Sequence, residues 1–489
     1  MFFNILRGGI TFATTMLLAR YLGAEDYGRM AFLLASFLAF KSLMDMYSSH
    51  AFFTFLSQKV RSKKFINMYW LWMGLQLFFS LCLIGFMLPD WVLAIVWVNE
   101  SRFLIIFALI ATFMQQGAWQ VASQMAEAQR ETIKVQKLGT IIIASHLIII
   151  LLLHYLEALT LPILFVLLTV QWAFGALFAA RIYVGNDNVS DTFSTAIFEF
   201  WVYCKPLIPY VWLAAAGDFL DRWMLQTWGG NTEQGYYAAA LNIMVVMSLA
   251  VVSVIRIFWK EIAEAYHQRD MALVELLYQR TTRLVYFFGA FIVGASLPWS
   301  SEIIVTLLGH EYTGGSITFM LMILYTAHQG LGQLNAVVLF ATANSKLQTI
   351  IGSISIIFSF LLAYYILAPE TVLIPGLNMG AAGLAWKMLI MNFLTVNVFG
   401  YFLARKFDWK YEWFFQFLVL GVLILAGYLA KALFFGVFEA MYSHLISSSL
   451  VYFVLVCFLC YFFPSQLLGV TKSELDDFLS NIGFMPRWR

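Results

Sequence analysis

Charged side chains are scarce in this sequence. Asp, Glu, Lys and Arg make up only 11% of its 489 residues, while the apolar types account for 62% and the mean hydropathy is +0.81. Soluble domains contain about 25% charged and about 45–50% apolar residues. A water-soluble fold cannot cover this much apolar surface. The composition therefore excludes a soluble domain and predicts an all-α, polytopic membrane protein.

Cysteines and metal-ligand patterns are also sparse. The four thiols lie in or beside apolar runs, at Cys82, Cys204, Cys457 and Cys460, where cysteine packs as a small apolar residue. The last two lack the aqueous βαβ setting of a redox CxxC. His146, His154 and His328 lie singly in apolar segments without a partner at metal-ligand spacing. We expect no disulfide framework, no metal and no cofactor. The net charge of +2 gives no reason to expect a nucleic-acid partner.

Long polar loops are missing as well. A membrane glycosyltransferase or polymerase needs an acid–base or metal-binding constellation at an aqueous edge. The outward connections are too short to supply one, and the isolated pair Asp90 and Glu100 does not make such a constellation. The sequence therefore predicts a protein that is not an enzyme.

Apolar segments of membrane-spanning length follow one another along the chain. We predict about fourteen spans, at residues 2–22, 28–55, 66–88, 103–125, 138–156, 160–182, 203–228, 235–258, 284–308, 315–343, 348–368, 380–404, 413–436 and 444–463. Lys and Arg gather in alternate connections between the predicted spans. By the positive-inside rule, we expect an inner-membrane protein with both termini in the cytoplasm. Pro206 and Pro209 predict a kink in the span at 203–228.

Two motifs occur twice in the same order. Residues 18–32, LARYLGAEDYGRMAF, resemble residues 225–240, LQTWGGNTEQGYYAAA, which matches Gly23 with Gly229 and Gly28 with Gly235. In the same way QQGAWQ, which begins at Gln115, resembles HQGLGQ. The separation along the sequence between the two copies is similar for both motifs. The repeat predicts two parallel six-helix lobes with a transport path between them.

The predicted domains follow from this repeat. They are an N-lobe at residues 1–200, a C-lobe at 201–408, two extra spans at 409–463 and a cytoplasmic tail at 464–489. In the tail, Thr471 and Glu474 are spaced as the capping box of a short amphipathic helix.

Ionisable residues inside the predicted spans are the candidate functional residues, because charges in lipid are costly and usually face a cavity or one another. They are Arg7, Lys41, Asp45, Asp218, Asp221, Arg222, Arg256 and Lys387. At a spacing of four residues, Lys41 can neutralise Asp45 and Asp218 can neutralise Arg222. These pairs either pin helices together or contribute to ion coupling.

Three of the cations have no acidic partner at helical spacing. Arg7, Arg256 and Lys387 leave positive charge inside the membrane, which suits an anion such as a phosphate or diphosphate. The alternative for Arg256 is that its side chain reaches the inner membrane surface together with Lys260.

Several motifs together carry a family resemblance. They are LARYLGAEDYG at residues 18–28, Asp221 and Arg222 followed by GYYAAALN at 235–242, the turn from Thr342 to Lys346, and GAAGLAW at 380–386. On these motifs the chain resembles the Wzx-type polysaccharide-biosynthesis flippases of the multidrug/oligosaccharidyl-lipid/polysaccharide (MOP) exporter superfamily. The resemblance extends over nearly the whole length.

That resemblance implies a fold and a substrate. It implies two six-helix lobes around a cationic cavity that carries an undecaprenyl-diphosphate-linked oligosaccharide, such as an O-antigen unit, from the inner to the outer leaflet by alternating access. Basic residues in spans 1, 2, 8 and 12 are the expected cavity charges, which here are Arg7, Lys41, Arg256 and Lys387. Expected partners are the lipid-linked glycan, a coupling proton or sodium ion, membrane lipid and the polysaccharide polymerase or chain-length machinery.

Two other transport functions remain open. A peptidoglycan-precursor (lipid II) flippase would share the span count and the cationic cavity. A multidrug/cation antiporter of the same superfamily would have acidic residues dominating the cavity, whereas Arg and Lys outnumber the unpaired carboxylates here. Asp218 and Asp221 are the candidate carriers of a coupling proton.

Overall fold

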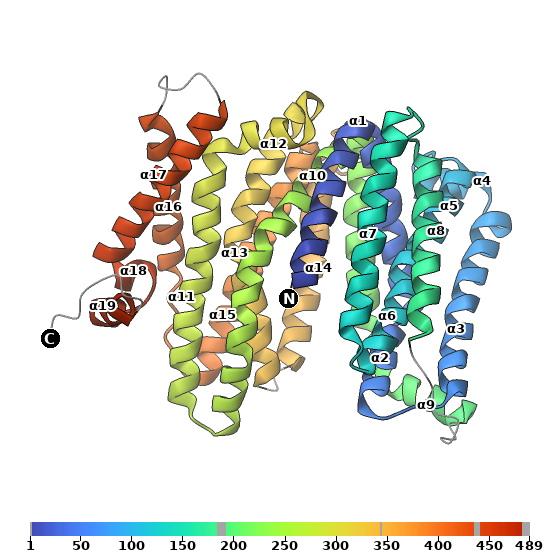
Figure 1. Cartoon of the computed structure of the whole chain (residues 1–489), viewed down its shortest axis with the longest axis horizontal. Helices are drawn as coiled ribbons and strands as arrows, with labels where there is room; N and C mark the ends of the chain where they lie inside the picture. The colour runs from blue at the N-terminus through green and yellow to red at the C-terminus, as the bar shows by residue number, and fades with distance from the viewer. Residues whose placement is uncertain (1, 183–191, 343–344, 435–440, 482–489) are drawn as a thin grey trace. The chain divides into compact units, whose positions relative to one another are not determined.

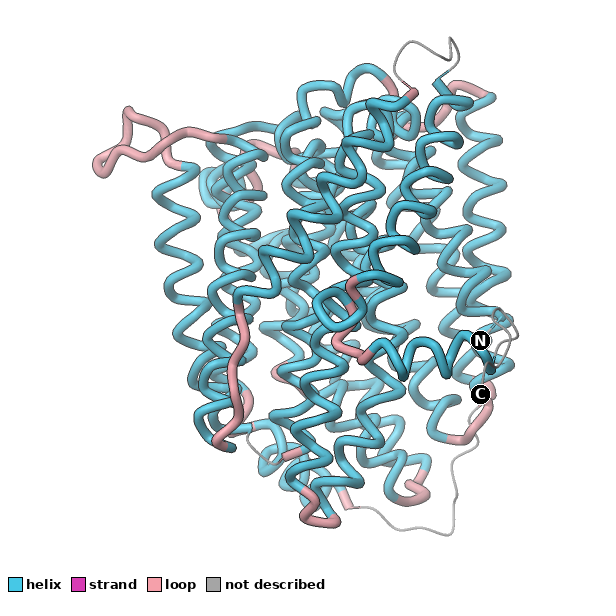
Figure 2. The backbone as a smooth tube through the Cα atoms, turned by 90° about the vertical axis from the view of Figure 1, so that its left-hand side faces the viewer, coloured by secondary structure: helices cyan, strands magenta, loops and turns pink. Residues whose placement is uncertain are grey.

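The structure is a computed structural model that describes residues 2–182, 192–342, 345–434 and 441–481. Within these ranges the chain contains helices and loops but no strand (Figure 2). The all-α class predicted from composition is therefore confirmed.

Most long helices coincide with predicted spans. They are α3 (Lys63–Cys82), continued by the π-helical turn η1 (Leu83–Met87), α5 (Arg102–Phe113), continued through the π-helical turn η2 (Met114–Ala118) into α6 (Trp119–Ala128), α7 (Thr132–Tyr155), α8 (Leu161–Ala180), α11 (Met271–Ser296), α13 (Ser316–Ala341), α14 (Ser345–Leu367), α15 (Gly380–Phe407), α16 (Phe414–Leu433) and α17 (Met441–Phe462). Short helices connect or flank them: α2 (Ser48–Gln58), α4 (Asp90–Val96), α9 (Phe193–Cys204), α12 (Ser300–Leu308) between the 3-10 turns η3 (Leu297–Trp299) and η4 (His310–Gly315), α18 (Pro464–Leu467) and α19 (Lys472–Asn481).

Two helices are too long for a single crossing of a membrane. Helix α1 (Phe2–Asp45) has 44 residues and α10 (Ile208–His267) has 60 residues. At 1.5 Å per residue they would measure about 66 and 90 Å, against a hydrocarbon core of about 30 Å. Each is interrupted by one glycine with non-helical backbone angles, Gly23 in α1 and Gly230 in α10. Each can therefore supply two membrane-crossing legs.

A contact within α10 shows that its legs turn back on each other. The Arg222 guanidinium lies 4.4 Å from the centre of the Tyr237 ring. Fifteen residues of straight helix would separate the two Cα atoms by about 22 Å. The chain must therefore bend sharply at Gly230. Among the described residues nine helices are long and apolar enough to span a membrane, or ten with the bent α1–α2 pair. The count of fourteen stays a prediction.

The internal repeat is visible in the backbone, with one correction of register. The break in α10 falls at Gly230 and not at Gly229, so Gly230 is the counterpart of Gly23. The two turns also pack in a reciprocal way. A Cβ built on Gly28 would lie 1.8 Å from the Asn231 carbonyl oxygen, and one built on Gly235 would lie 2.0 Å from the Ala24 carbonyl oxygen. Only glycine allows the two backbones to approach this closely.

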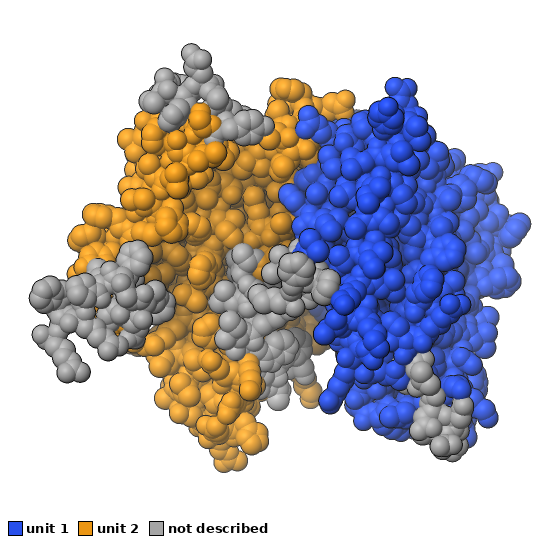
Figure 3. Space-filling view, viewed as in Figure 1, with its two compact units in different colours: residues 1–239, 356–384 blue, residues 240–355, 385–489 orange. Residues whose placement is uncertain are grey.

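The contacts divide the chain into two compact units, coloured in Figure 3. Unit 1 contains Met1–Ala239 and Ile356–Leu384, and unit 2 contains Ala240–Ser355 and Ala385–Arg489. In unit 2, α11 packs against α13 and α16, and α16 packs against α17. The predicted lobe boundaries at residues 200 and 408 stay a prediction.

In unit 1 the first leg of α1 runs along α7 (Figure 1). Arg7 lies beside Gly139 near the start of α7, and Tyr21 stacks on His154 near its end, with ring centres 3.6 Å apart. Both contacts advance in the same direction along the two helices. The first leg of α1 is therefore parallel to α7.

The prolines at the start of α10 do not kink a span, in contrast to the prediction. Helix α9 ends at Cys204, a turn contains Pro206, and α10 begins at Ile208 with Pro209 in its first turn. Proline fits the first turn of a helix because the amide that it lacks has no acceptor there.

The C-terminal tail docks on α11. Thr471 and Glu474 form the predicted capping box: the Thr471 amide donates to Glu474 Oε2 at 2.9 Å, and the Glu474 amide donates to Thr471 Oγ1 at 3.3 Å. Glu474 Oε1 also pairs with Arg280 at 2.6 Å, and Arg283 donates to the Ser465 carbonyl oxygen at 2.6 Å. The tail is thus attached to α11 through two arginines.

We predict that Gly28→Ala lowers the stability of the purified protein by about 1–3 kcal/mol, because the new methyl group overlaps the Asn231 carbonyl. Thermal unfolding in detergent measures the change. Gly74→Ala is the matched control, since nothing lies within 4 Å of a Cβ at this helical glycine. Equal melting temperatures for the two variants would contradict the close crossing of the turns.

Docking of the tail should depend on pH. The amide and hydroxyl of Thr471, followed by Arg280, hold the pKa of Glu474 below its usual range. A lowered pKa means that the docked state is favoured while Glu474 is ionised, and that this preference is lost as the pH falls through the lowered value. Amide hydrogen exchange of residues 472–481, corrected for the intrinsic rate, should show protection at neutral pH that declines in acid. Glu474→Gln should reduce protection at neutral pH and remove this decline; an unchanged pH profile in this variant would refute the assignment.

Candidate functional site

The chain breaks between α1 and α2, in the middle of the segment 28–55 that the sequence predicted as one continuous span. Met46 and Tyr47 have φ values of +49° and +69°, and α2 leaves α1 at an angle of 60°. Neither residue is glycine, so each left-handed backbone costs of order 1 kcal/mol or more. Broken helices inside a membrane occur where the backbone lines a cavity or a binding site.

Asp45 holds this break in place. Its carboxylate accepts hydrogen bonds from Ser48 Oγ at 2.9 Å and from Ser49 Oγ at 2.8 Å, and the Ser49 amide donates to it at 3.2 Å. Tyr69 of α3 approaches the same carboxylate, with its hydroxyl at 3.5 Å. Asp45 therefore satisfies one free backbone donor at the start of α2, the Ser49 amide, and two side-chain hydroxyls, a role similar to that of an N-terminal capping residue.

Lys41, one turn before Asp45, is buried without a counter-charge. The residue is only 8% exposed, and its ammonium makes no hydrogen bond or ion pair with any residue that the structure describes. The expected pairing with Asp45 is absent because the carboxylate is directed to the serines. His50, which stacks on Tyr47, is the nearby titratable group that experiences both charges.

An isolated buried ammonium is energetically costly. Burying a charge without a partner costs several kcal/mol, so a chain usually pairs or exposes it. A position that keeps such a charge is by default a place where a ligand of opposite charge binds. Lys41 and the α1–α2 break together form the candidate site, with Asp45 as the residue that fixes its backbone.

Arg7 lies elsewhere in unit 1, between α1 and α7. A Cβ built on Gly139 would lie 3.5 Å from Arg7 Nη1 and 3.2 Å from the Trp119 ring, so the missing side chain of Gly139 leaves room for both groups. Arg7 is partly buried and has no ion-pair partner in the described part of the chain. No described contact joins it to Lys41. It remains a second candidate anion ligand.

The charges on the first leg of α10 do not pair as expected. Arg222 lies over Tyr237 of the second leg, and its Nη1 has no hydrogen-bond partner among the described atoms. It does not pair with Asp218, which is exposed. Asp221 is partly buried and has an interaction of its own. The expected ion pair between Asp218 and Arg222, which would pin helices together, is therefore absent from the described residues.

The remaining predicted cations belong to unit 2. Lys387 on α15 is 5% exposed and has an interaction partner. Arg256 lies on α10, but its side chain falls outside the described residues. Both stay predictions as anion ligands.

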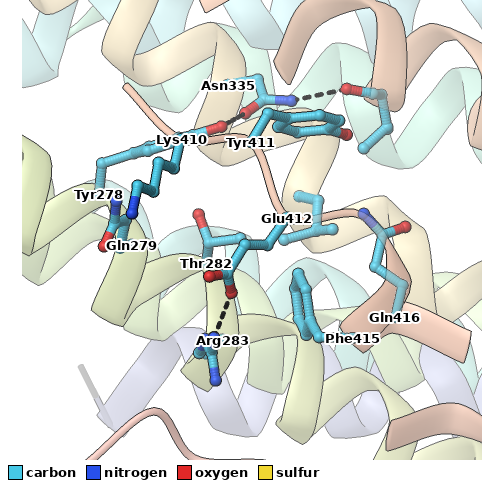
Figure 4. Close-up of a pocket in the computed structure, with 12 residues that line it drawn as sticks. Tyr278, Gln279, Thr282, Arg283, Asn335, Lys410, Tyr411, Glu412, Phe415 and Gln416 are labelled. Carbon is cyan, nitrogen blue, oxygen red and sulfur yellow. Dashed lines mark hydrogen bonds and ion pairs between the residues drawn. The ribbon is translucent and has the colours of Figure 1, made fainter. Parts of the chain in front are cut away.

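A small polar pocket of about 50 Å³ lies among α11, α13, α15 and α16 in unit 2 (Figure 4). The Tyr278 hydroxyl donates to Asn335 Oδ1 at 2.9 Å, and Arg283 pairs with Glu412 on the pocket wall. Ligand sites for drug-sized molecules measure about 300–1,000 Å³. This pocket suits a few bridging water molecules. Its size excludes it as the site of a glycan.

Sequence reasoning missed the residues that build the α1–α2 break. Ser48, Ser49, His50 and Tyr69 surround Asp45, and no glycine or proline marks the bend. One signal was available: the polar run YSSH at residues 47–50 interrupts an otherwise apolar span. Hydroxyl and imidazole groups in the middle of a span need local partners, and a break in the helix supplies them.

Comparisons with known proteins identify the fold. No protein-family model and no curated protein matches the chain. Among solved structures, "Lipid II flippase MurJ, inward closed conformation" is similar with a TM-score of 0.72 and 14% identity, over 94% of this chain and 98% of that one. An inward-facing multidrug resistance MATE family transporter of the MOP superfamily gives 0.53 and 12%, over 83% and 94%. An outward-facing MATE structure gives 0.52 and 10%, over 82% and 93%.

At these identities the likeness establishes the fold. The chain is a multi-pass membrane protein with the fold of MOP-superfamily transporters, as expected from the sequence. The matched structures are a flippase and transporters, and not enzymes.

We predict that Lys41→Met stabilises the ligand-free protein by about 1–3 kcal/mol, because it replaces an unpaired buried charge by an apolar chain of similar length. Thermal unfolding of the purified protein measures the effect. A clear fall in the melting temperature would mean that Lys41 has a structural partner. Lys134→Met, at an exposed lysine, controls for the general effect of removing a charge.

Asp45→Ala should have the opposite effect. The substitution removes the hydrogen bonds to Ser48 and Ser49 and should destabilise the protein by about 1–2 kcal/mol, as the loss of a helix cap does. The same unfolding assay applies, and Asp45→Asn should recover part of the loss because its side-chain oxygen can still accept. Unchanged stability in Asp45→Ala would refute the capping role.

Proposed function

We propose that this chain is a flippase that moves an undecaprenyl-diphosphate-linked oligosaccharide, an O-antigen or other surface polysaccharide unit, from the inner to the outer leaflet. The observation that carries the proposal is Lys41, a buried lysine at a broken helix that has no counter-charge among the residues that the structure describes. In a transporter fold, such a charge is best explained by an anionic cargo that neutralises it during transport.

The chemistry of a lipid diphosphate fits the candidate residues. A diphosphate carries several acceptor oxygens and a charge that both ammonium and guanidinium groups bind strongly. Lys41 and Arg7 supply two cations from α1, and Lys387 and Arg256 are the further ligands that the family resemblance suggests. Sugars add hydroxyl groups, which neutral polar side chains can bind. The charged end of the cargo is therefore the part that this chain recognises through its cations.

Alternating access supplies the transport mechanism in this proposal. The crossing of Gly28 with Asn231 and of Gly235 with Ala24 joins the corresponding turns of the two repeats within unit 1. We infer that this crossing of the two turns closes the transport path on the outer side of the membrane in the conformation described here. Neutralisation of Lys41 by the cargo would remove the cost of an isolated charge and allow the carrier to change state. Asp218 and Asp221 are the candidate residues for coupling to a proton or sodium ion.

Two further parts of the proposal concern location. We propose an inner-membrane protein with both termini in the cytoplasm, since Lys and Arg gather on the corresponding side of the predicted spans. The polysaccharide polymerase and chain-length machinery would receive the exported unit and are proposed partners.

A lipid II flippase is the second candidate. It is favoured by the similarity to the MurJ structure over 94% of this chain. Lipid II is also a lipid-linked diphosphate, so the same cations would serve. A multidrug/cation antiporter is less consistent with this site, because Asp45 uses its carboxylate to cap α2 and the uncompensated charge is positive.

Complementation distinguishes these functions. The variants Lys41→Ala and Arg7→Ala are expressed in the native host after its chromosomal copy of this gene has been deleted. We expect surface glycan on these cells to fall at least about tenfold while the lipid-linked intermediate accumulates. Arg256→Ala and Lys387→Ala test the remaining cations. Lys134→Ala serves as the control, and membrane levels of all variants are compared.

Normal export by all four cation variants would overturn the proposed role of the cationic residues. To test the second candidate, the wild-type gene is expressed in cells depleted of their lipid II flippase. Rescue of growth there, with no effect on surface glycan in the native host, would replace the first candidate by the second.

A further inference from the structure

Helix α9 has two largely apolar faces. One face packs against neighbouring helices, and the other is exposed. Ala196 and Cys204 face inward and belong to a core formed with α2, α3 and α6. Phe200 on the same face stacks on Phe65 with ring centres 5.6 Å apart. The opposite face exposes large side chains at helical spacing, namely Phe193, Ile197, Phe198, Trp201 and Val202. Phe198 is 66% exposed and Trp201 53%.

An ion pair fixes the orientation of α9. The Glu199 carboxylate forms an ion pair with the Arg61 guanidinium at 2.7 Å and lies 3.7 Å from Lys59 Nζ. The Arg61 side chain is 3% exposed, and its guanidinium lies over the Phe65 ring at 4.5 Å. A buried, stacked arginine of this kind prevents α9 from rolling. The aromatic face is therefore held outward and not transiently exposed.

The position of α9 along α3 sets its depth. Its contacts are with Phe65 and Tyr69, in the first two turns of a span that begins at Lys63. These residues lie within about 9 Å of the start of that span. With 12 residues, α9 is about 18 Å long and cannot cross a core of about 30 Å. Its contacts therefore place it beside the end of the α3 span and not beside the middle of that span.

Exposed lysines lie at the end of α9 and in the segment from α2 to α3 that packs against it. Lys59, Lys63, Lys64 and Lys205 are all exposed at the end of α2, the start of α3 and the end of α9. Lys205 Nζ lies 5.8 Å from the Trp201 ring. Glu199 is the acidic residue that the structure places near them, and it pairs with Arg61 at 2.7 Å and with Lys59 at 3.7 Å. The surface thus combines aromatic side chains for the acyl region with cations for the phosphate level.

We propose that α9, with Lys59, Lys63, Lys64 and Lys205, forms a binding surface for anionic phospholipid headgroups. The aromatic face enters the boundary of the acyl region, and the lysines bind phosphates of the same leaflet. A membrane surface is favoured over a protein partner because the face lies at the depth of the lipid headgroups and carries the charge that complements anionic lipid. This inference is independent of the transported cargo.

Native mass spectrometry of the full-length protein tests the charge selectivity. The wild type, saturated with equal amounts of phosphatidylglycerol and phosphatidylcholine, should retain phosphatidylglycerol preferentially. Lys64→Gln/Lys205→Gln should reduce this preference about tenfold, since each lysine near an anionic surface contributes to binding. Lys134→Gln/Lys260→Gln, which removes two exposed lysines elsewhere, should leave it unchanged. Equal preference in both double variants would overturn the proposal.

A competition arm separates the possible sources of phosphate. Inorganic phosphate should not displace phosphatidylglycerol, because it lacks the acyl chains that the aromatic face contacts. Displacement by inorganic phosphate would show a simple anion site and overturn the lipid surface. Displacement by polyprenyl diphosphate at low concentration would show that this surface binds the transported lipid. That result would overturn the proposal that the surface acts independently of the cargo.

Photo-cross-linking tests the occupant directly. Benzoylphenylalanine in place of Phe198, in protein reconstituted into phosphatidylcholine vesicles with and without phosphatidylglycerol, should cross-link to lipid acyl chains. Trp201→Ala in the same protein should lower the yield. In whole cells the same probe should again report lipid; a stoichiometric protein cross-link there would replace the membrane by a protein partner and refute the proposal.

Discussion

The burial of Lys41 beside an Asp45 carboxylate that already binds Ser48 and Ser49 is the constraint on which the candidate site depends. A Lys and an Asp four residues apart on one helix would normally neutralise each other. Here Asp45 is the last residue of α1 and accepts from Ser48 and Ser49 at the start of α2. The break between the helices therefore removes the partner of Lys41. Strain in the backbone at Met46 and Tyr47, the capping of α2 and the isolated charge are consequences of one local arrangement.

In the proposed function, this arrangement links stability to transport. An isolated charge destabilises the ligand-free protein, and a bound anion would remove that penalty. Ligand binding and a change of state can then be coupled without any covalent chemistry, provided that the cargo neutralises the charge differently in the two states. Elsewhere in unit 1 the backbones cross closely at Gly28 and Gly235, and the Arg61–Glu199 ion pair joins α9 to the chain just before α3.

Much of this fold could be predicted from the sequence because hydropathy reports on membrane-spanning helices directly. The long apolar segments correspond to helices such as α7, α8 and α16, and the capping box at Thr471 formed as its spacing indicated. The repeat was recognised, but its register was one residue off, because Gly229 and Gly230 are adjacent and sequence alone does not show which one leaves the helical conformation.

The candidate site was predicted only in part. Lys41 and Asp45 stood out as charges in an apolar span, but the sequence suggested that they pair. The break at Met46 and Tyr47 involves no glycine or proline, and it depends on tertiary contacts such as Tyr69. Helix α9 (Phe193–Cys204) was missed as well, since the predicted spans 160–182 and 203–228 left most of its residues in the connection between them. Local patterns do not show which of two apolar faces a neighbour will cover.

The most direct test of this account is whether a lipid diphosphate recognises Lys41. The measurement is the thermal unfolding of the purified protein with undecaprenyl diphosphate and with undecaprenol, which lacks the charged group. The account predicts that the diphosphate stabilises the wild type more than the alcohol does, and that Lys41→Met abolishes this difference. Equal stabilisation of wild type and Lys41→Met by the diphosphate would contradict it.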